Sequence, residues 1–273
     1  MNRTPQRDSR TTLTVAVAGV VVLAMGMSMM ACTSSEHPSR TSPTPSTTTS
    51  TISTTQSTSS TTTTTMKPSA SLGSDLPLFP FSTAQEVRTW QQSYASGGHQ
   101  PWHLDAGQSA LGFTAWLGFS GIDKVIGMRT DDTGAHVSVG FYVGGPNNEN
   151  TTSAIVHLVH WGTGSDAPWE VVGTDDTTFS LTRPAYGATV TSPVTVGGFI
   201  SGVDENIKIQ VHTSSSSAAV GTFCCLPAGN VNAPWSAPVS FTASSGAVLA
   251  IAAQTGGHVA AVERFTVTGV HVR

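Results

Sequence analysis

Apolar residues recur with a helical period in two segments after residue 80. The first stripe consists of Val87, Trp90 and Tyr94, and the second consists of Ala110, Phe113 and Leu117. Thr83 precedes the first stripe as an N-cap, with Glu86 at the capping-box spacing, and Asp105 precedes the second. Gly118 follows the second stripe as a C-cap. The pattern predicts two helices.

After these two segments, apolar residues recur every second residue and no longer with the helical period of 3.6 residues. In AHVSVGFYV (135–143) apolar residues alternate with small or polar ones, and SAIVHLVHW and PWEVVG are further strands. Helices packed on one face of an antiparallel sheet predict an α+β domain over residues 76–176. DAGQSALGFTAWLGF, with PWEVVGT at the end of the strands, resembles nuclear-transport-factor-like and cystatin-like domains. Such domains often enclose a cavity, so a small-ligand or hydrolytic pocket is one alternative here.

Residues 177–273 contain short alternating runs and no helical pattern. NIKIQVH alternates cleanly, and PVSF, AVLAIAAQ and ERFTVTGVHV follow between clusters of Gly, Ser and Pro. This is the pattern of an all-β sandwich. In the last run, Phe265 and Val267 have one phase and Val270 and Val272 the other. The change of phase predicts a β-bulge at Gly269.

The start of this region carries a family resemblance. LTRPAYGATVTSPVTVGGFISGVDENIKIQV has a Pro–x–x–Gly entry, a Ser–Pro before VTVGG, and an acidic loop into an alternating strand. It resembles the immunoglobulin-like domain of bacterial spore-germination proteins. The resemblance implies an immunoglobulin-like sandwich that serves as a cell-surface accessory domain and carries no catalytic residues. Residues 76–176 do not resemble the partner domains of germination proteins.

The first 32 residues read as an export signal. Arg3, Arg7 and Arg10 precede an uncharged, largely apolar run that ends in SMMAC. This ending resembles the lipobox of bacterial lipoproteins, although Met29 stands where Leu is usual. The resemblance implies cleavage before Cys32 and a lipid on its thiol. The alternative is an uncleaved membrane span. Both interpretations place the rest of the chain on the extracytoplasmic face of the cell membrane.

A low-complexity tract follows the signal. Between residues 33 and 65, 25 of 33 residues are Ser or Thr. Such a composition offers almost no apolar surface to offset the entropy of ordering. We therefore expect residues 33–75 to form a disordered stalk between the lipid anchor and the folded region.

The charge of the chain excludes some partners. It has 12 basic and 16 acidic residues, of which five basic and two acidic ones precede residue 75. Residues 75–273 thus hold 7 basic and 14 acidic residues, a net charge of −7. Nucleic acids require clustered Lys and Arg, so a nucleic-acid partner is not expected.

Cys224 and Cys225 are the thiols that remain once Cys32 is lipidated. Outside the cell membrane, a pair of cysteines suggests oxidation. Adjacent Cα atoms lie about 3.8 Å apart, below the usual disulfide span of about 4.4 Å or more, so a vicinal disulfide would be strained. Two reduced cysteines on opposite faces of a strand are the alternative.

The remaining reactive residues form no recognisable site. His157 and His160 are three residues apart on a predicted strand, so they face opposite ways. The pairs Asp131–Asp132 and Asp175–Asp176 lie in turn contexts, where Asp side chains satisfy backbone groups. The sequence contains no G-x-S-x-G, H-E-x-x-H or phosphate-loop motif. We therefore expect no catalytic residue, no bound metal and no cofactor.

These observations predict a lipid-anchored protein of the cell envelope that binds or scaffolds and is not an enzyme. Its expected partners are the membrane, through the lipid at Cys32, and an envelope protein or a cell-wall glycan. Carbohydrate binding is an alternative, because the six tryptophans could include a sugar-stacking platform, although their phasing places most of them in the core.

Overall fold

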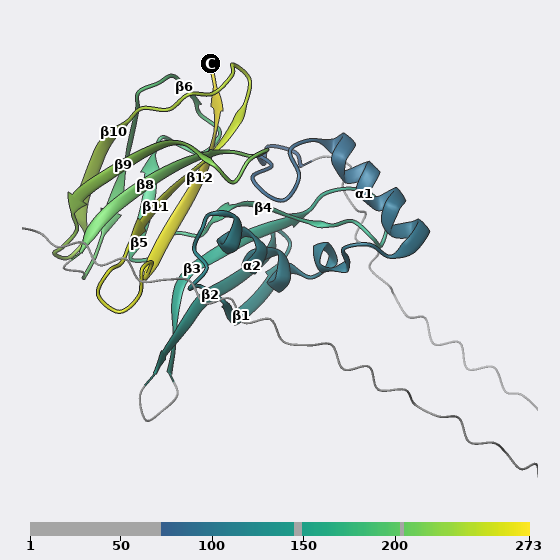
Figure 1. Ribbon diagram of the computed structural model, residues 1–273, viewed down its shortest axis with the longest axis horizontal. Coiled ribbons are helices and arrows are strands. Elements are labelled where there is room, and N and C mark those ends of the chain that lie inside the picture. Colours follow the sequence, from purple (N-terminus) through teal and green to yellow (C-terminus); the bar gives the residue numbers. More distant parts are fainter. Residues whose placement is uncertain (1–71, 145–148, 203–204) are drawn as a thin grey trace, which may run out of the picture. The chain divides into compact units, whose positions relative to one another are not determined.

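The structure, a computed structural model, describes residues 72–144, 149–202 and 205–273 (Figure 1). All of them belong to one compact unit. The predicted signal peptide, the lipid attachment at Cys32 and most of the predicted stalk lie outside the described residues. In the part of the chain that is described, no helix is long and apolar enough to cross a membrane.

A four-stranded antiparallel sheet and two α-helices form the first half of this unit. The strands are β1 (Lys124–Asp131), β2 (Gly134–Gly144), β3 (Glu149–His160) and β4 (Trp169–Thr174), paired in chain order. The helices are α1 (Ala84–Gly97), the short 3₁₀ helix η1 (Pro101–Leu104) and α2 (Ala106–Trp116). Figure 1 shows α2 lying across the four-stranded sheet.

Side-chain caps begin both α-helices, as the sequence predicts. Thr83 Oγ1 accepts a hydrogen bond from the Glu86 amide, and Asp105 accepts one from the Gln108 amide. The Glu86 carboxylate in turn accepts from the Ser82 amide. These bonds satisfy amides that the first helical turn leaves free. Gly118 follows the C-cap of α2 with φ 82°.

The second half consists of two further sheets around one apolar core. The three-stranded sheet has the order β10 (Ala233–Val239), β7 (Val194–Ile200) and β5 (Phe179–Arg183). The five-stranded sheet has the order β6 (Thr189–Val190), β12 (Arg264–Val272), β11 (Val248–Thr255), β8 (Asn206–Thr213) and β9 (Ala219–Pro227). Large side chains from both sheets, among them Phe179, Ile209 and Trp235, fill the space between them. This packing is compatible with a β-sandwich.

Strand β12 is buried on both faces. Phe265 and Val267 belong to the core formed with α2 and the four-stranded sheet, whereas Val270 and Val272 belong to the sandwich core. The predicted bulge at Gly269 is wrong, because β12 pairs with β11 without a register shift and Gly269 lies opposite Ala250. A strand buried on both faces carries apolar residues in both phases without a bulge.

Gly269 has a different role. A Cβ atom at this position would lie 3.1 Å from Leu78 Cδ2 and 3.2 Å from Tyr186 Cε2. The glycine therefore allows the segment around Leu78 and the ring of Tyr186 to pack closely against β12.

The predicted α+β N-terminal domain is wrong. Of the residues that the structure describes, 47% lie in strands and 15% in helices, and only two α-helices occur among them. The core beneath α2 also contains Ala250, Ala252, Phe265 and Val267 from β11 and β12. The helices are thus an addition to a mainly β structure. The period of a segment predicts its secondary structure but not which sheet covers its apolar face.

Candidate functional site

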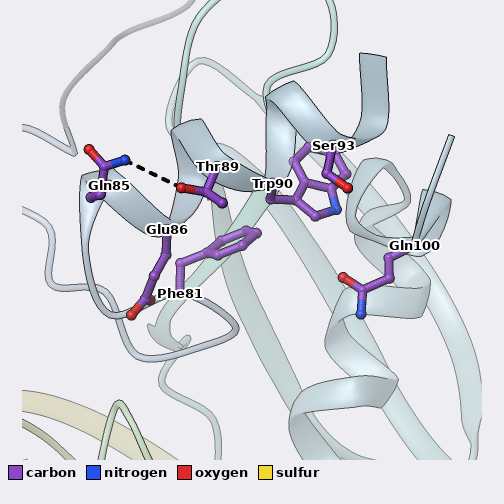
Figure 2. Close-up of a pocket in the computed structure, with 7 residues that line it drawn as sticks. All are labelled: Phe81, Gln85, Glu86, Thr89, Trp90, Ser93 and Gln100. Atoms are coloured by element: carbon purple, nitrogen blue, oxygen red, sulfur yellow. Dashed lines mark hydrogen bonds between the residues drawn. The ribbon is translucent and has the colours of Figure 1, made fainter. Parts of the chain in front are cut away.

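A cleft of about 330 Å³ lies along one side of α1 (Figure 2). We call it the α1 cleft. Its lining consists of Phe81, Gln85, Glu86, Thr89, Trp90, Ser93 and Gln100. Gln85, Thr89 and Ser93 lie on α1 at helical spacing, and Gln100 follows the helix. The capped start of α1 therefore fixes which of its side chains face the cleft.

Apolar and hydrogen-bonding groups share this lining. Phe81 and Trp90 supply aromatic surface, and Trp90 stacks on Tyr94 with a centroid distance of 5.3 Å. Trp90 is only 6% exposed, and its buried Nε1 has no hydrogen-bond partner among the described residues. Gln85 Nε2 donates to Thr89 Oγ1 over 3.3 Å. Such a mixture of apolar walls and a few polar groups is typical of small-molecule sites.

The rim of the α1 cleft contains one residue in an uncommon conformation. Gln100 has φ 55°, in the left-handed region that residues other than glycine rarely adopt. Its Oε1 lies 3.4 Å from His103 Nε2. In Figure 2 the amide of Gln100 lies on the side of Trp90 from which the indole nitrogen projects. Strained residues of this kind often occur at binding sites.

His103 packs against Phe81 and Trp90, the two aromatic side chains that line the cleft. Its ring lies between aromatic neighbours, with centroid distances of 4.9 Å to Phe81, 5.0 Å to Trp90 and 3.6 Å to Trp102. Burial lowers the pKa of His103 to about 4. The ring is therefore neutral at pH 7 and acts as part of the aromatic packing.

Glu170 fixes the position of Phe81. Its carboxyl group is fully buried, and the two oxygens accept hydrogen bonds from the amides of Phe79 (2.9 Å) and Phe81 (3.2 Å). Burial raises the pKa of Glu170 well above its ordinary value, despite these two donors. Glu170 therefore attaches the segment that precedes α1 to β4.

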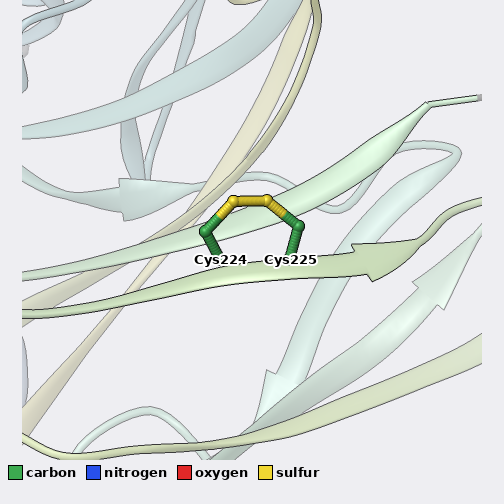
Figure 3. The surroundings of a disulfide bond; sticks show 2 residues. All are labelled: Cys224 and Cys225. Atoms are coloured by element: carbon green, nitrogen blue, oxygen red, sulfur yellow. A yellow bond between two sulfur atoms is a disulfide. The ribbon is translucent and has the colours of Figure 1, made fainter. Parts of the chain in front are cut away.

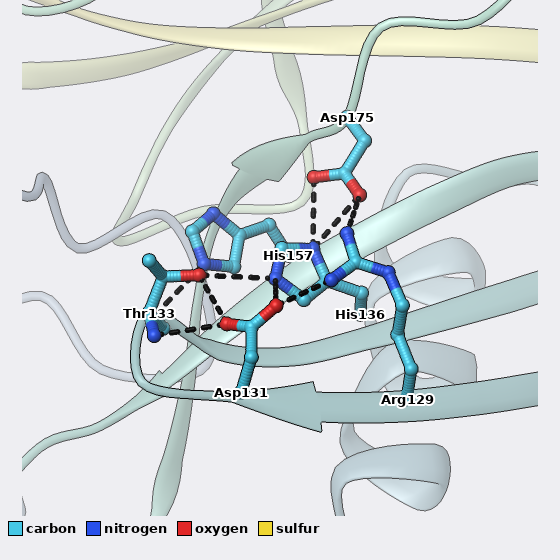
Figure 4. A network of polar contacts seen from close by, with 6 residues as sticks. All are labelled: Arg129, Asp131, Thr133, His136, His157 and Asp175. Atoms are coloured by element: carbon cyan, nitrogen blue, oxygen red, sulfur yellow. Dashed lines mark hydrogen bonds and ion pairs between the residues drawn. The ribbon is translucent and has the colours of Figure 1, made fainter.

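A network of polar side chains covers the other face of the four-stranded sheet (Figure 4). His136 Nδ1 donates to Asp175 Oδ2 over 2.8 Å, and Arg129 bridges Asp175 (3.1 Å) and Asp131. The amide and hydroxyl of Thr133 donate to Asp131, and these bonds lower the pKa of Asp131 far below its usual range. The network joins the β1–β2 turn to the end of β4.

His136 and Arg129 were not predicted from the sequence as members of a site. His136 alternates with buried valines on β2, and its ring stacks on that of His157 with a centroid distance of 4.5 Å. One feature of the sequence could have indicated the network. His136 lies in the alternate phase to the valines of β2, and the ends of two strands of the same sheet carry Asp residues. Asp131 does satisfy its own turn, as predicted, but Asp175 binds His136 instead.

A second cleft, of about 350 Å³, lies where β4, β5 and β12 meet the segment before α1. We call it the threonine cleft. Its lining consists of Asp75, His157, Val172, Gly173, Thr174, Asp176, Leu181, Thr182, Tyr186, Thr266, Val267 and Thr268. No Lys or Arg side chain occurs among these described residues. The cleft therefore combines several hydroxyl groups with two carboxylates.

His157 and His160 have different hydrogen-bond partners. His157 Nε2 donates to the Thr133 carbonyl over 3.1 Å, whereas His160 Nδ1 donates to the Ala167 carbonyl and its ring stacks on Trp169. Within the described ranges, no group of three or more His, Cys, Asp or Glu side chains could hold a metal ion.

Cys224 and Cys225 lie on β9, the end strand of the five-stranded sheet, and their Sγ atoms form a disulfide bond (Figure 3). Both residues are exposed. Neither cysteine lines the α1 cleft or the threonine cleft.

Comparison with known proteins gives no relative: no family model, no curated protein and no solved structure matches the chain.

Proposed function

We propose that this protein is a lipid-anchored binding protein of the cell envelope that recognises a neutral glycan of the cell wall through the α1 cleft. The observation that carries the proposal is the lining of this cleft. Gln85, Ser93 and Gln100 offer hydrogen bonds to the hydroxyl and amide groups of a sugar, and beneath them Phe81 and Trp90, which are 7% and 6% exposed, contribute a small apolar floor.

Binding rather than catalysis fits the charges of the cleft. Among the described residues that line it, Glu86 is the only ionisable one, and its carboxylate accepts from the Ser82 amide over 2.6 Å. General acid–base catalysis needs a positioned proton donor and acceptor beside the reacting bond. A single carboxylate engaged in a helix cap does not supply that pair.

We infer that the ligand binds at the surface and not in the core between α2 and the four-stranded sheet. The space between α2 and the four-stranded sheet is filled by apolar side chains, including Phe113, Val137 and Leu158, all of them fully buried. A polar ligand would lose its hydrogen bonds to water there without replacement. The α1 cleft is open to solvent and retains polar groups at its rim.

The cellular setting of the proposal comes from the sequence. The lipobox-like SMMAC and the stretch rich in Ser and Thr would hold the folded region near the cell wall, and the resemblance to a germination-protein domain supports a surface role. In that setting a cell-wall glycan is present at high local concentration, so weak binding at an open cleft suffices.

A pulldown with purified cell wall tests the proposal. The variant Thr89→Tyr places a large side chain in the cleft from an exposed helical position, and Gln92→Tyr makes a similar change at an exposed position of α1 outside it. We expect wild type and Gln92→Tyr to sediment with the cell wall and Thr89→Tyr to remain in solution. Equal sedimentation of both variants, or none by wild type, would refute the proposal.

A further inference from the structure

The Cys224–Cys225 disulfide lies on an open edge of the five-stranded sheet. Strand β9 is an end strand of this sheet, and both cysteines are exposed. Near the start of β9 the Thr242 amide donates to the Val220 carbonyl, so that part of the edge is covered. Among the described residues, no backbone hydrogen bond from outside β8 reaches the two cysteines. A thiol in solution can therefore approach their sulfur atoms.

The position of this disulfide in the chain does not suit a stabilising role. A disulfide stabilises a protein largely because it restricts the unfolded chain, and the effect increases with the length of the loop that it closes. Cys224 and Cys225 are adjacent, so their bond closes no loop of intervening residues and connects β9 to no other strand. A chemical role explains an exposed pair of this kind better.

The two cysteines differ in their cross-strand neighbours. Cys224 lies directly opposite Lys208 of β8, whereas Cys225 is the extra residue where the register between β8 and β9 shifts. Directly opposite side chains share one face of a sheet, with Cβ atoms about 4.5–5.5 Å apart. The exposed, flexible side chain of Lys208 can therefore bring its ammonium group beside the sulfur of Cys224. A nearby cation stabilises a thiolate, which makes Cys224 the better leaving group of the pair.

No described carboxylate is paired with Lys208. Its neighbour on the other side of β8 is Gln254 of β11, which is neutral. Lys208 also forms no ion pair with any residue that the structure describes. Its positive charge is therefore available to a thiolate at Cys224.

From this arrangement we propose that Cys224 and Cys225 form a redox-active site that exchanges with small thiols, with Lys208 as a positioning residue. A thiolate attacks the sulfur of Cys225 and forms a mixed disulfide with it, while the bond between the two cysteines breaks and Cys224 leaves as a thiolate beside Lys208. A second thiolate then attacks the sulfur of the bound thiol and releases Cys225. In sum, two thiols are oxidised to one disulfide, the Cys224–Cys225 disulfide is reduced to two thiols, and the two protons of the incoming thiols pass to the cysteines through water.

The reaction of the full chain with 2-mercaptoethanol, an uncharged thiol, tests this assignment in a Cys32→Ser background. Samples are quenched with acid at successive times and followed by intact mass. We expect an oxidised protein at the start, a transient mixed disulfide, and two free thiols at the end. Tandem mass spectrometry should place the added thiol on Cys225. Hydroxyethyl disulfide should then restore the oxidised protein.

Lys208→Gln removes the cation beside Cys224 and should slow the reduction about twofold to threefold. Lys124→Gln makes the same change on β1 and should leave the rate unchanged. Added salt should reduce the difference between wild type and Lys208→Gln, because it screens exposed charges, whereas a merely structural role of Lys208 would not depend on salt in this way. Free thiols in the untreated protein, equal rates for wild type and Lys208→Gln, equal slowing by both substitutions, or a mixed disulfide on Cys224 would overturn the proposal.

Discussion

Phe265 connects the two halves of the described structure, and its truncation tests that connection. The residue lies on β12 and is 1% exposed. Its ring packs edge-on against Phe119 with a centroid distance of 5.3 Å, in the core shared with α2 and the four-stranded sheet. Truncation of a fully buried Phe to Ala costs about 3–5 kcal/mol. In a unit of roughly 200 residues this lowers Tm by about 6–20 °C.

Thermal unfolding followed by tryptophan fluorescence measures this effect in the half that does not contain the substitution. Five of the six tryptophans lie between residues 90 and 169, so the signal reports mainly on the helices and the four-stranded sheet. We expect Phe265→Ala to shift this transition to lower temperature. Phe199→Ala, in the same half but at a ring that is 43% exposed, should shift it much less.

An unchanged fluorescence transition in Phe265→Ala would refute this reasoning. It would mean that residues 76–176 unfold independently of the sandwich strands. A separate calorimetric transition that alone moves with the substitution would also show independent unfolding.

Three further predictions concern single groups. Because burial raises the pKa of Glu170, the native state keeps a proton that the unfolded chain releases above about pH 4.5. Stability should therefore fall as pH rises above that value, and Glu170→Gln should lose this part of the pH dependence in urea unfolding between pH 5 and 8; an identical pH slope in both proteins would contradict the assignment. Cys224 and Cys225 should resist alkylation in the native protein and take up two labels after reduction, as read by intact mass in a Cys32→Ser background; labelling without reductant would show free thiols. Cys32→Ala should release the protein from membranes or change its precursor size in cells, and an unaltered size and membrane fraction would exclude the lipid anchor.

Local patterns in the sequence predict the helices well. The caps at Thr83 and Asp105 are confirmed because a capping bond involves residues only three positions apart. The predicted fold class is wrong because residues distant in the sequence complete the core beneath α2. Ala250 and Phe265 complete the core under α2 from more than 100 residues away, and no periodicity in either segment reports this contact.

The candidate sites were less visible in the sequence. The α1 cleft depends on Phe81, which Glu170 holds in place from 89 residues away. The polar network depends on His136 and Asp175, whose separation of 39 residues gives no motif. Both arrangements arise from strand pairing, which brings distant residues together without a fixed spacing in the chain.

The most direct test of the proposed function is an NMR shift map of the folded region with tri-N-acetylglucosamine. We expect saturable shifts for amides of residues 81–100, with Thr89→Tyr abolishing them. Shifts confined to other parts of the molecule, or none up to the solubility of the sugar, would contradict glycan binding at the α1 cleft.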